Sequence, residues 1–146
     1  MTNIKNYTSQ VPAYQSIQSI ESMLIEAGAT RIMKDYAGGK AISISFMLME
    51  GAMPIPIKLP AKVDEVKKLL KGSSRVTPKN LDAQAERTSW KLIHDWVQIQ
   101  ISMYKLRQVE LLEIFLPYMY DFNKKETFIQ KVRSSGMLQL NAASEQ

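Results

Sequence analysis

The sequence contains no cysteine and a single histidine, His94. Without cysteine, the chain can form neither disulfides nor thiolate zinc sites, and it has no cysteine nucleophile. One histidine cannot build a multi-histidine metal centre. The sequence also lacks a run of about 18 uncharged apolar residues and an apolar stretch near its beginning. We therefore expect neither a membrane span nor a secretory signal, and we predict a cytoplasmic protein.

The 146 residues otherwise have an ordinary globular composition, with 45% hydrophobic and 23% charged residues. A chain of this length buries roughly two thirds of its unfolded surface, so it can fold without a metal or a disulfide. We expect a single domain that starts with a frayed polar segment (residues 1–10). Its parts are an α-β-β-β-α unit (1–72), a linker (73–80), a helical part packed on that unit (81–133) and a mobile tail (134–146).

The net charge of +5 is concentrated in one segment. Residues 58–79 hold seven basic and two acidic residues, whereas the rest of the chain holds 12 of each. Such clustering attracts phosphates or an acidic partner, although a solvated lysine face is the other interpretation of the same pattern. The candidate phosphate-binding residues are Lys58, Lys62, Lys67, Lys68, Lys71, Arg75 and Lys79. A smaller basic excess near the C-terminus comprises Lys124, Lys125, Lys131 and Arg133.

The hydropathy pattern changes along the first half of the chain. Apolar residues three and four apart predict a helix over about 12–27. Strict alternation over 41–49 predicts a strand, which forms a three-stranded antiparallel meander with neighbours at 31–36 and 54–59. Two prolines in the third strand remove backbone donors and so predict an edge position. A short helix ended by Gly72 follows.

A long helical pattern occupies 81–116 and carries two adjacent apolar stripes. So wide an apolar face must be covered by the sheet and by either the C-terminal helix or a second copy of the chain. Pro117 is expected to end this helix, and Asn123 with Glu126 predicts a capping box that opens a last helix through about Arg133. The predicted fold class is therefore α+β, a small antiparallel sheet packed on helices with one long central helix.

No constellation of residues makes a convincing catalytic or metal site. His94 and Asp95 are neighbours on a helix, where successive side chains diverge by about 100°, so we expect no bond between them. We interpret His94 as a partly buried, hydrogen-bonded residue. The run from Asp64 to Lys67 resembles the acidic triplet of metal-dependent nucleases, but it lies on a helix and the preceding strand has no acid. We predict a non-enzymatic protein without catalytic residues, metal or cofactor.

Large aromatic side chains could serve either the core or a binding surface. Trp90 and Trp96 lie on the long helix, where core packing is the preferred interpretation and base stacking the alternative. The dense apolar run at the end of that helix could be a buried corner, a docking patch or a dimer contact. The candidate protein-interface residues are Trp90, Trp96, Phe115, Tyr118 and Tyr120.

Three segments together resemble a group of small proteins encoded by phages and prophages. These segments are Ala85–Trp90 with Asp95-Trp96, Phe115–Tyr118, and Lys58–Pro60. The likeness implies that the protein is encoded by a phage or prophage and resides in the host cytoplasm. It implies no particular activity. A second likeness is topological, because the expected element order over 12–72 is similar to that of double-stranded-RNA-binding domains. Those domains place lysines at the start of their second helix to grip phosphates.

Two functional hypotheses follow. The first is a nucleic-acid-associated accessory protein, encoded by a phage or mobile element, that binds DNA or RNA phosphates through the basic segment. The alternative is a protein-interaction module, such as an inhibitor of a host defence or replication protein or an assembly component. This alternative includes a homo-oligomer formed through the long helix.

Overall fold

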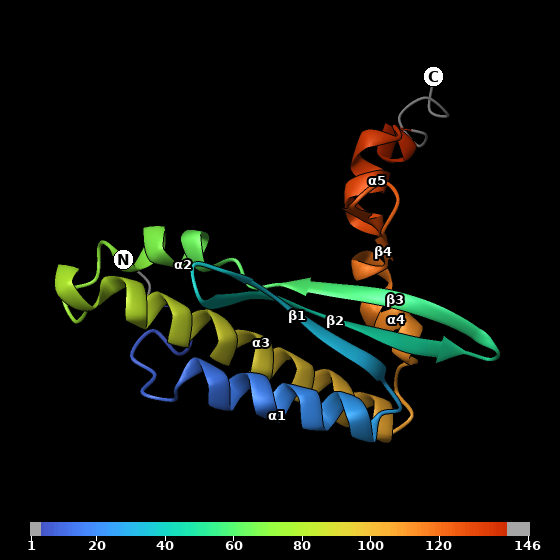
Figure 1. Cartoon of the computed structure of the whole chain (residues 1–146), viewed down its shortest axis with the longest axis horizontal. Helices are drawn as coiled ribbons and strands as arrows, with labels where there is room; N and C mark the ends of the chain where they lie inside the picture. The colour runs from blue at the N-terminus through green and yellow to red at the C-terminus, as the bar shows by residue number, and fades with distance from the viewer. Residues whose placement is uncertain (1–3, 140–146) are drawn as a thin grey trace.

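The computed structural model describes residues 4–139 and has the predicted α+β architecture (Figure 1). The helices are α1 (Ala13–Glu26), α2 (Val63–Leu70), α3 (Leu81–Lys105), α4 (Leu111–Phe115) and α5 (Phe128–Ser134). The strands are β1 (Thr30–Ala37), β2 (Lys40–Glu50), β3 (Met53–Pro60), β4 (Tyr120–Asp121) and β5 (Glu126–Thr127). Short 3-10 helices lie at Pro78–Asn80, Leu116–Tyr118 and Met137–Gln139.

The sheet is the predicted meander, with the strand order β1-β2-β3. Strand β3 lies at an edge, as its prolines predict, because Pro54 and Pro56 cannot donate hydrogen bonds to a second neighbouring strand. Alternation along β2 and β3 turns Ile44, Phe46 and Ile57 to the inner face, where each is almost completely buried. One face of the meander therefore belongs to the hydrophobic core.

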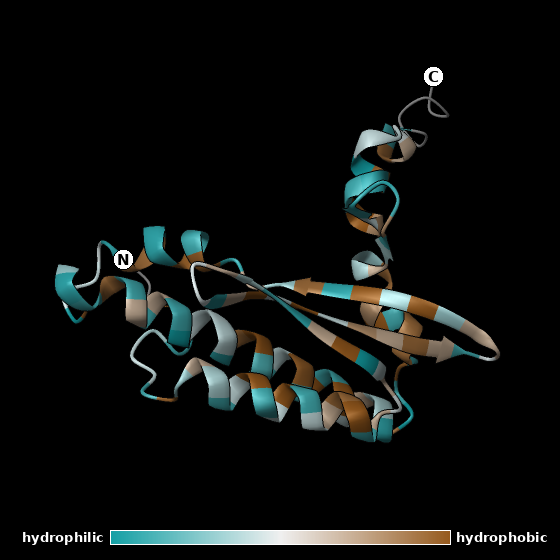
Figure 2. Cartoon of the chain, viewed as in Figure 1, coloured by the Kyte–Doolittle hydropathy of each residue, from teal (hydrophilic) through white to brown (hydrophobic). Residues whose placement is uncertain are grey.

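Helices α1 and α3 lie side by side against that face and run in the same direction (Figure 1). Buried apolar residues of both helices and of the three strands form one core, and Figure 2 shows hydrophobic positions along these elements. Because α1 and the sheet cover α3 from two sides, its wide apolar face is largely satisfied within one chain. The apolar residues of the two helices that are completely buried are Ile20, Leu24, Ala85, Trp90 and Val97.

Helix α3 ends at Lys105, earlier than predicted. Arg107 has the left-handed φ of 60°, and its N–H donates to the carbonyl of Tyr104 at 2.9 Å. The N–H of the following residue donates to the carbonyl of Met103, also at 2.9 Å. This pair of bonds is the Schellman motif that closes many helices, and glycine usually takes the left-handed position, as Gly28 does after α1. The prediction was wrong because arginine stands where glycine would mark the helix end.

Replacing Arg107 with glycine should raise the free energy of unfolding by about 0.5–1 kcal/mol. A left-handed conformation costs a residue with a side chain roughly 1 kcal/mol or more, and the greater freedom of glycine in the unfolded chain offsets part of this gain. Urea denaturation measures the change, and Arg107→Ala, which keeps the unfavourable φ, is the control. A lower urea midpoint for Arg107→Gly than for the parent protein would contradict the expectation.

The last helix begins at Phe128, so the capping box predicted at Asn123 was wrong. The actual box comprises Thr127 and Gln130. The Thr127 N–H donates to Gln130 Oε1 at 2.8 Å, and the Gln130 N–H donates to Thr127 Oγ1 at 3.4 Å. The N–H of Asn123 instead donates to Asp121 Oδ1 in the turn between β4 and β5. The Asp121 side chain therefore stabilises a turn at the position where the helix cap was predicted, and Thr127 caps the helix instead.

Strands β4 and β5 with helix α5 form a C-terminal arm that stands away from the sheet (Figure 1). The arm is attached where Met119 bridges Ile57 on the edge of β3 and accepts a hydrogen bond from the Phe128 N–H at 2.7 Å. Residues 134–139 of the predicted tail contain the end of α5 and a 3-10 helix. Residues 140–146 of that predicted tail lie outside the described residues.

The N-terminal segment is not frayed in the part that the structure describes. The side chains of Gln84 and Arg87 on α3 donate to the carbonyl of Ser9, each at 3.1 Å. One turn along, Thr88 Oγ1 donates to the carbonyl of Asn6 at 2.8 Å. Polar side chains of α3 therefore hold the segment by hydrogen bonds to its backbone carbonyls. Because the segment has no periodic pattern of apolar residues, its sequence does not predict this placement.

Candidate nucleic-acid interface

The basic segment folds mainly as α2 and the loop that leads into α3. Val63, Val66 and Leu70 form the apolar side of α2 and pack with Leu81 and Ala85 at the start of α3. The charged residues of α2 therefore lie on its exposed side, and Figure 2 shows hydrophilic positions on α2 and on the first turns of α3. Packing on α3 gives this charged surface a fixed support.

Two of the candidate phosphate-binding lysines already contact acidic side chains. Lys67 Nζ lies 2.6 Å from Asp82 Oδ1, and this hydrogen bond raises the pKa of Lys67 and lowers the pKa of Asp82. Lys68 Nζ lies 3.6 Å from Glu65 Oε1. Both pairs are at the surface, where water screens them, so a phosphate can replace the carboxylate at little cost.

Four other candidates have no ionic partner in residues 4–139. All four are exposed, and they lie directly before α2, directly after it, in the loop that follows and in the 3-10 helix that precedes α3. Their charge is not neutralised by neighbouring carboxylates, so the end of the molecule formed by α2 and the start of α3 has a positive potential. We call these residues the free basic set: Lys62, Lys71, Arg75 and Lys79.

Lys58 does not belong with this set. It alternates with the buried Ile57 and Leu59, so its side chain lies on the outer face of the sheet. Its Nζ lies 3.3 Å from Asp35 Oδ2 and 4.7 Å from the centroid of the Tyr120 ring. An ion pair and a cation–π contact therefore compensate its charge, and we leave Lys58 out of the interface.

A pocket of about 300 Å³ lies beside α2, between the end of β3, α3 and the 3-10 helix that follows α4. Its lining is mostly apolar, and Lys62 is the one charged residue among its lining residues. Trp96 forms part of the wall, and its ring makes edge-to-face contacts with Phe115 and Tyr118 at centroid distances of 5.8 Å. These contacts hold the indole in one orientation.

The candidate protein-interface residues separate into two groups. Trp90 and Phe115 are fully buried in the core, so neither side chain can reach a partner without opening the fold. Three are half-buried and remain accessible at the surface: Trp96, Tyr118 and Tyr120. For the two fully buried residues, the preferred interpretation of large aromatic side chains as core was confirmed.

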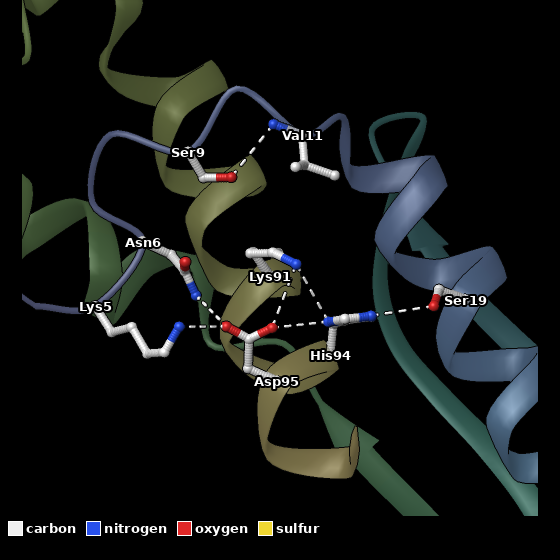
Figure 3. A network of polar contacts seen from close by, with 8 residues as sticks. All are labelled: Lys5, Asn6, Ser9, Val11, Ser19, Lys91, His94 and Asp95. Carbon is white, nitrogen blue, oxygen red and sulfur yellow. Dashed lines mark hydrogen bonds and ion pairs between the residues drawn. The ribbon is translucent and has the colours of Figure 1, made fainter. Parts of the chain in front are cut away.

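A polar network centred on Asp95 was missed in the sequence (Figure 3). His94 Nδ1 lies 2.8 Å from Asp95 Oδ1, so the prediction that these neighbours cannot bond was wrong. The two side chains leave the helix in different directions, but the imidazole is long enough to reach back over the helix surface. The carboxylate also accepts from Lys5 at 2.6 Å and Asn6 at 2.9 Å, and it pairs with Lys91 at 3.3 Å.

The network extends to α1 through Ser19, whose Oγ lies 3.0 Å from His94 Nε2. The order Ser19–His94–Asp95 is that of a hydrolytic triad. Acyl transfer, however, also needs N–H donors beside the serine, and Ser19 lies within α1, where the backbone N–H groups donate to carbonyls four residues earlier. We therefore interpret the network as a structural link between α1, α3 and the N-terminal segment.

Replacing Asp95 with asparagine should lower the free energy of unfolding by about 2 kcal/mol near pH 7, because a partly buried charged acceptor loses several donors. Burial raises the pKa of Asp95, but hydrogen bonds from Lys5, Asn6, His94 and Lys91 outweigh it and hold the pKa well below its ordinary value. A pKa that is lower in the folded state stabilises the protein above the unfolded pKa of about 4. That contribution is lost as the pH falls through the folded pKa.

The difference between the parent protein and Asp95→Asn should therefore shrink between about pH 5 and pH 2. Urea denaturation across this range measures it. Asp64→Asn, on the exposed side of α2, serves as the control and should change little. A difference that is constant with pH would show that packing, and not the ionised carboxylate, supplies the stability.

The other candidate chemistry has structural roles. The run from Asp64 to Lys67 lies on α2, and within residues 4–139 no group of three or more acidic or histidine side chains could hold a metal. Glu113 Oε1 accepts a hydrogen bond from the Glu110 N–H at 3.0 Å, which caps α4. Over the same residues, no helix is both long and apolar enough to cross a membrane.

Comparisons of the chain with protein-family models, with curated proteins and with solved structures found no match. What the fold and the site define is a class, a small α+β protein with an exposed basic end beside an apolar pocket. The proposed function therefore rests on the contacts, charges and burial of this chain's own residues.

Proposed function

We propose that this protein binds nucleic acid through the free basic set, as a non-enzymatic accessory of a phage or mobile element. The supporting observation is the concentration of charge. The whole net charge of +5 falls within residues 58–79, and four basic side chains of this segment have no ionic partner in the described structure. Phosphate contacts position a nucleic acid without reading its sequence, so binding should be largely sequence-independent.

The position of α2 bears on the kind of nucleic acid. The observed element order is α1-β1-β2-β3-α2. This is the order on which the likeness to double-stranded-RNA-binding domains is based. Here, however, α2 packs on α3, which lies outside that unit, and an apolar pocket adjoins the basic end. The element order alone therefore does not favour a duplex, and single strands belong in the test.

Fluorescence anisotropy with labelled single- and double-stranded DNA and RNA tests the proposal. Four phosphate contacts predict a slope of about −3 to −4 for log K against log salt, which is a loss of affinity of about 100-fold between 50 and 200 mM salt. Absence of binding at 50 mM salt would reject the proposal. Binding that is indifferent to salt would reject phosphate contacts as its source.

A second candidate function is association with a protein, including a second copy of the chain. Exposed apolar side chains favour it, namely Ile99 on α3, Leu106 directly after α3, and Met137 and Leu138 in the 3-10 helix that follows α5. Apolar association persists in high salt, where phosphate binding collapses. Light scattering at 0.5 M salt should then report a mass above that of one chain. A monomer at every concentration would count against self-association.

A further inference from the structure

The pocket beside α2 adjoins the free basic set, because Lys62 belongs to both. The exposed ammonium group of Lys62 can contact a phosphate at the rim of the pocket. A group attached to that phosphate could then enter the apolar interior, where Leu92 and Trp96 form part of the lining. This arrangement suits a ligand that is anionic at one end and largely apolar at the other.

Ser89 is one of the lining residues, and its hydroxyl is a buried polar atom without a partner in the described structure. The residue is 3% exposed. A buried hydroxyl without a partner is unfavourable, and native structures usually satisfy such groups. A ligand with donors and acceptors along one edge would supply the missing bond once the hydroxyl turns toward the pocket.

The aromatic side chains of the pocket favour a planar ligand. Trp96 and Tyr118 both line it, and their edge-to-face contact holds the two rings in place before any ligand arrives. Bases of single-stranded nucleic acids stack on such side chains irrespective of sequence, because every base has a π face. An aliphatic side chain of an acidic peptide would fill the apolar part but leave Ser89 Oγ unpaired.

We infer that the pocket takes one unstacked base of a single-stranded nucleic acid whose phosphates contact the free basic set. This inference rests on the proposed function and makes it more specific. The base lies against Trp96, its polar edge meets Ser89, and its phosphate meets Lys62. A duplex cannot bind in this way without extruding a base, so single strands bind more tightly than duplexes of equal length.

Tryptophan fluorescence tests the inference with two single-stranded DNA 12-mers, one normal and one in which every position is abasic. Trp96 reports on the pocket, whereas Trp90 is fully buried in the core. The normal strand should bind about tenfold more tightly than the abasic strand and quench the emission, because only it has bases to stack. The abasic strand should bind through its phosphates with little quenching.

Three variants on α3 localise the effect. Leu92 lines the pocket, so Leu92→Phe should fill it and remove the tenfold preference without changing the affinity for the abasic strand. Ile99→Phe adds the same ring at an exposed position of the helix and should keep the preference. Ser89→Ala removes only the hydroxyl and should lower the preference in part. Urea midpoints close to that of the parent protein verify that each variant is folded.

Four outcomes would overturn the inference. Equal affinity for the two strands in the parent protein would show that no base enters the pocket, although phosphate binding would stand. An equal loss for both strands in Leu92→Phe would assign that residue a structural role. Quenching by an acidic peptide with one leucine, but not by the normal strand, would assign the pocket to a protein partner. Failure of both strands to bind would also reject the inference, and the proposed function itself would fall only if the duplex DNA and the RNA probes of the anisotropy series failed to bind as well.

Discussion

Reversing the charge of Lys71 and Arg75 together, as Lys71→Glu and Arg75→Glu, should weaken binding of a single-stranded oligonucleotide by about 100-fold at 50 mM salt. Both side chains are exposed and unpaired in the described structure, so the change removes two cations without breaking a native contact. The salt slope should fall in magnitude by about 2, one unit for each lost phosphate contact. Fluorescence anisotropy across a salt series measures both quantities.

A matched control changes the net charge by the same amount elsewhere. Lys124→Glu with Lys125→Glu alters two exposed lysines in the turn of the C-terminal arm. If the free basic set is the site, this control should lose far less affinity than the Lys71 and Arg75 variant. Equal losses would show that net charge rather than position governs binding. An unchanged affinity in the Lys71 and Arg75 variant would reject the interface.

Two other basic residues, Lys67 and Lys68, are unsuitable for this charge-reversal test because each already contacts a carboxylate. Lys67 contacts Asp82, and Lys68 contacts Glu65, so a glutamate at either position would oppose a carboxylate at short range. Such a variant would lose stability through like-charge repulsion as well as any phosphate contact, and the two effects would be mixed. Lys71 and Arg75 avoid this ambiguity.

Sequence periodicity predicted the sheet well because its determinants are local. Alternation along β2 and β3 fixes which side chains face inward, and the prolines of β3 restrict it to an edge. The same alternation could have separated Lys58 from the other lysines, because its neighbours Ile57 and Leu59 face the core. That signal was present in the sequence, but clustering along the chain obscured it.

Features that depend on contacts between distant segments could not be predicted in this way. Lys5 and Asn6 reach Asp95 across about 90 positions of the chain, and Ser19 reaches His94 across 75. No local pattern encodes such pairings. The pocket has the same origin, because its wall combines side chains from β3, α2, α3 and the 3-10 helix after α4. The sequence could predict a basic segment but not the cavity beside it.

Replacing Trp90 with alanine should lower the free energy of unfolding by about 3–5 kcal/mol, a large part of the 5–15 kcal/mol of a typical domain. Trp90 is fully buried between α3 and the sheet, and its Nε1 donates to the carbonyl of Ala41 at 3.2 Å. The substitution therefore creates a cavity and leaves a buried carbonyl with one donor fewer. Urea denaturation followed by circular dichroism measures the loss.

Two further variants separate the causes. Trp90→Phe keeps much of the ring volume but removes the indole N–H, so it should cost about 2 kcal/mol. Ile99→Ala, at an exposed position of the same helix, should stay within about 0.5 kcal/mol of the parent protein. If Trp90→Ala cost as little as Ile99→Ala, the core would not depend on Trp90. Because its indole joins α3 to Ala41 near the start of β2, Trp90 should stabilise the packing of α3 on the sheet, and α3 supports both α2 and the pocket.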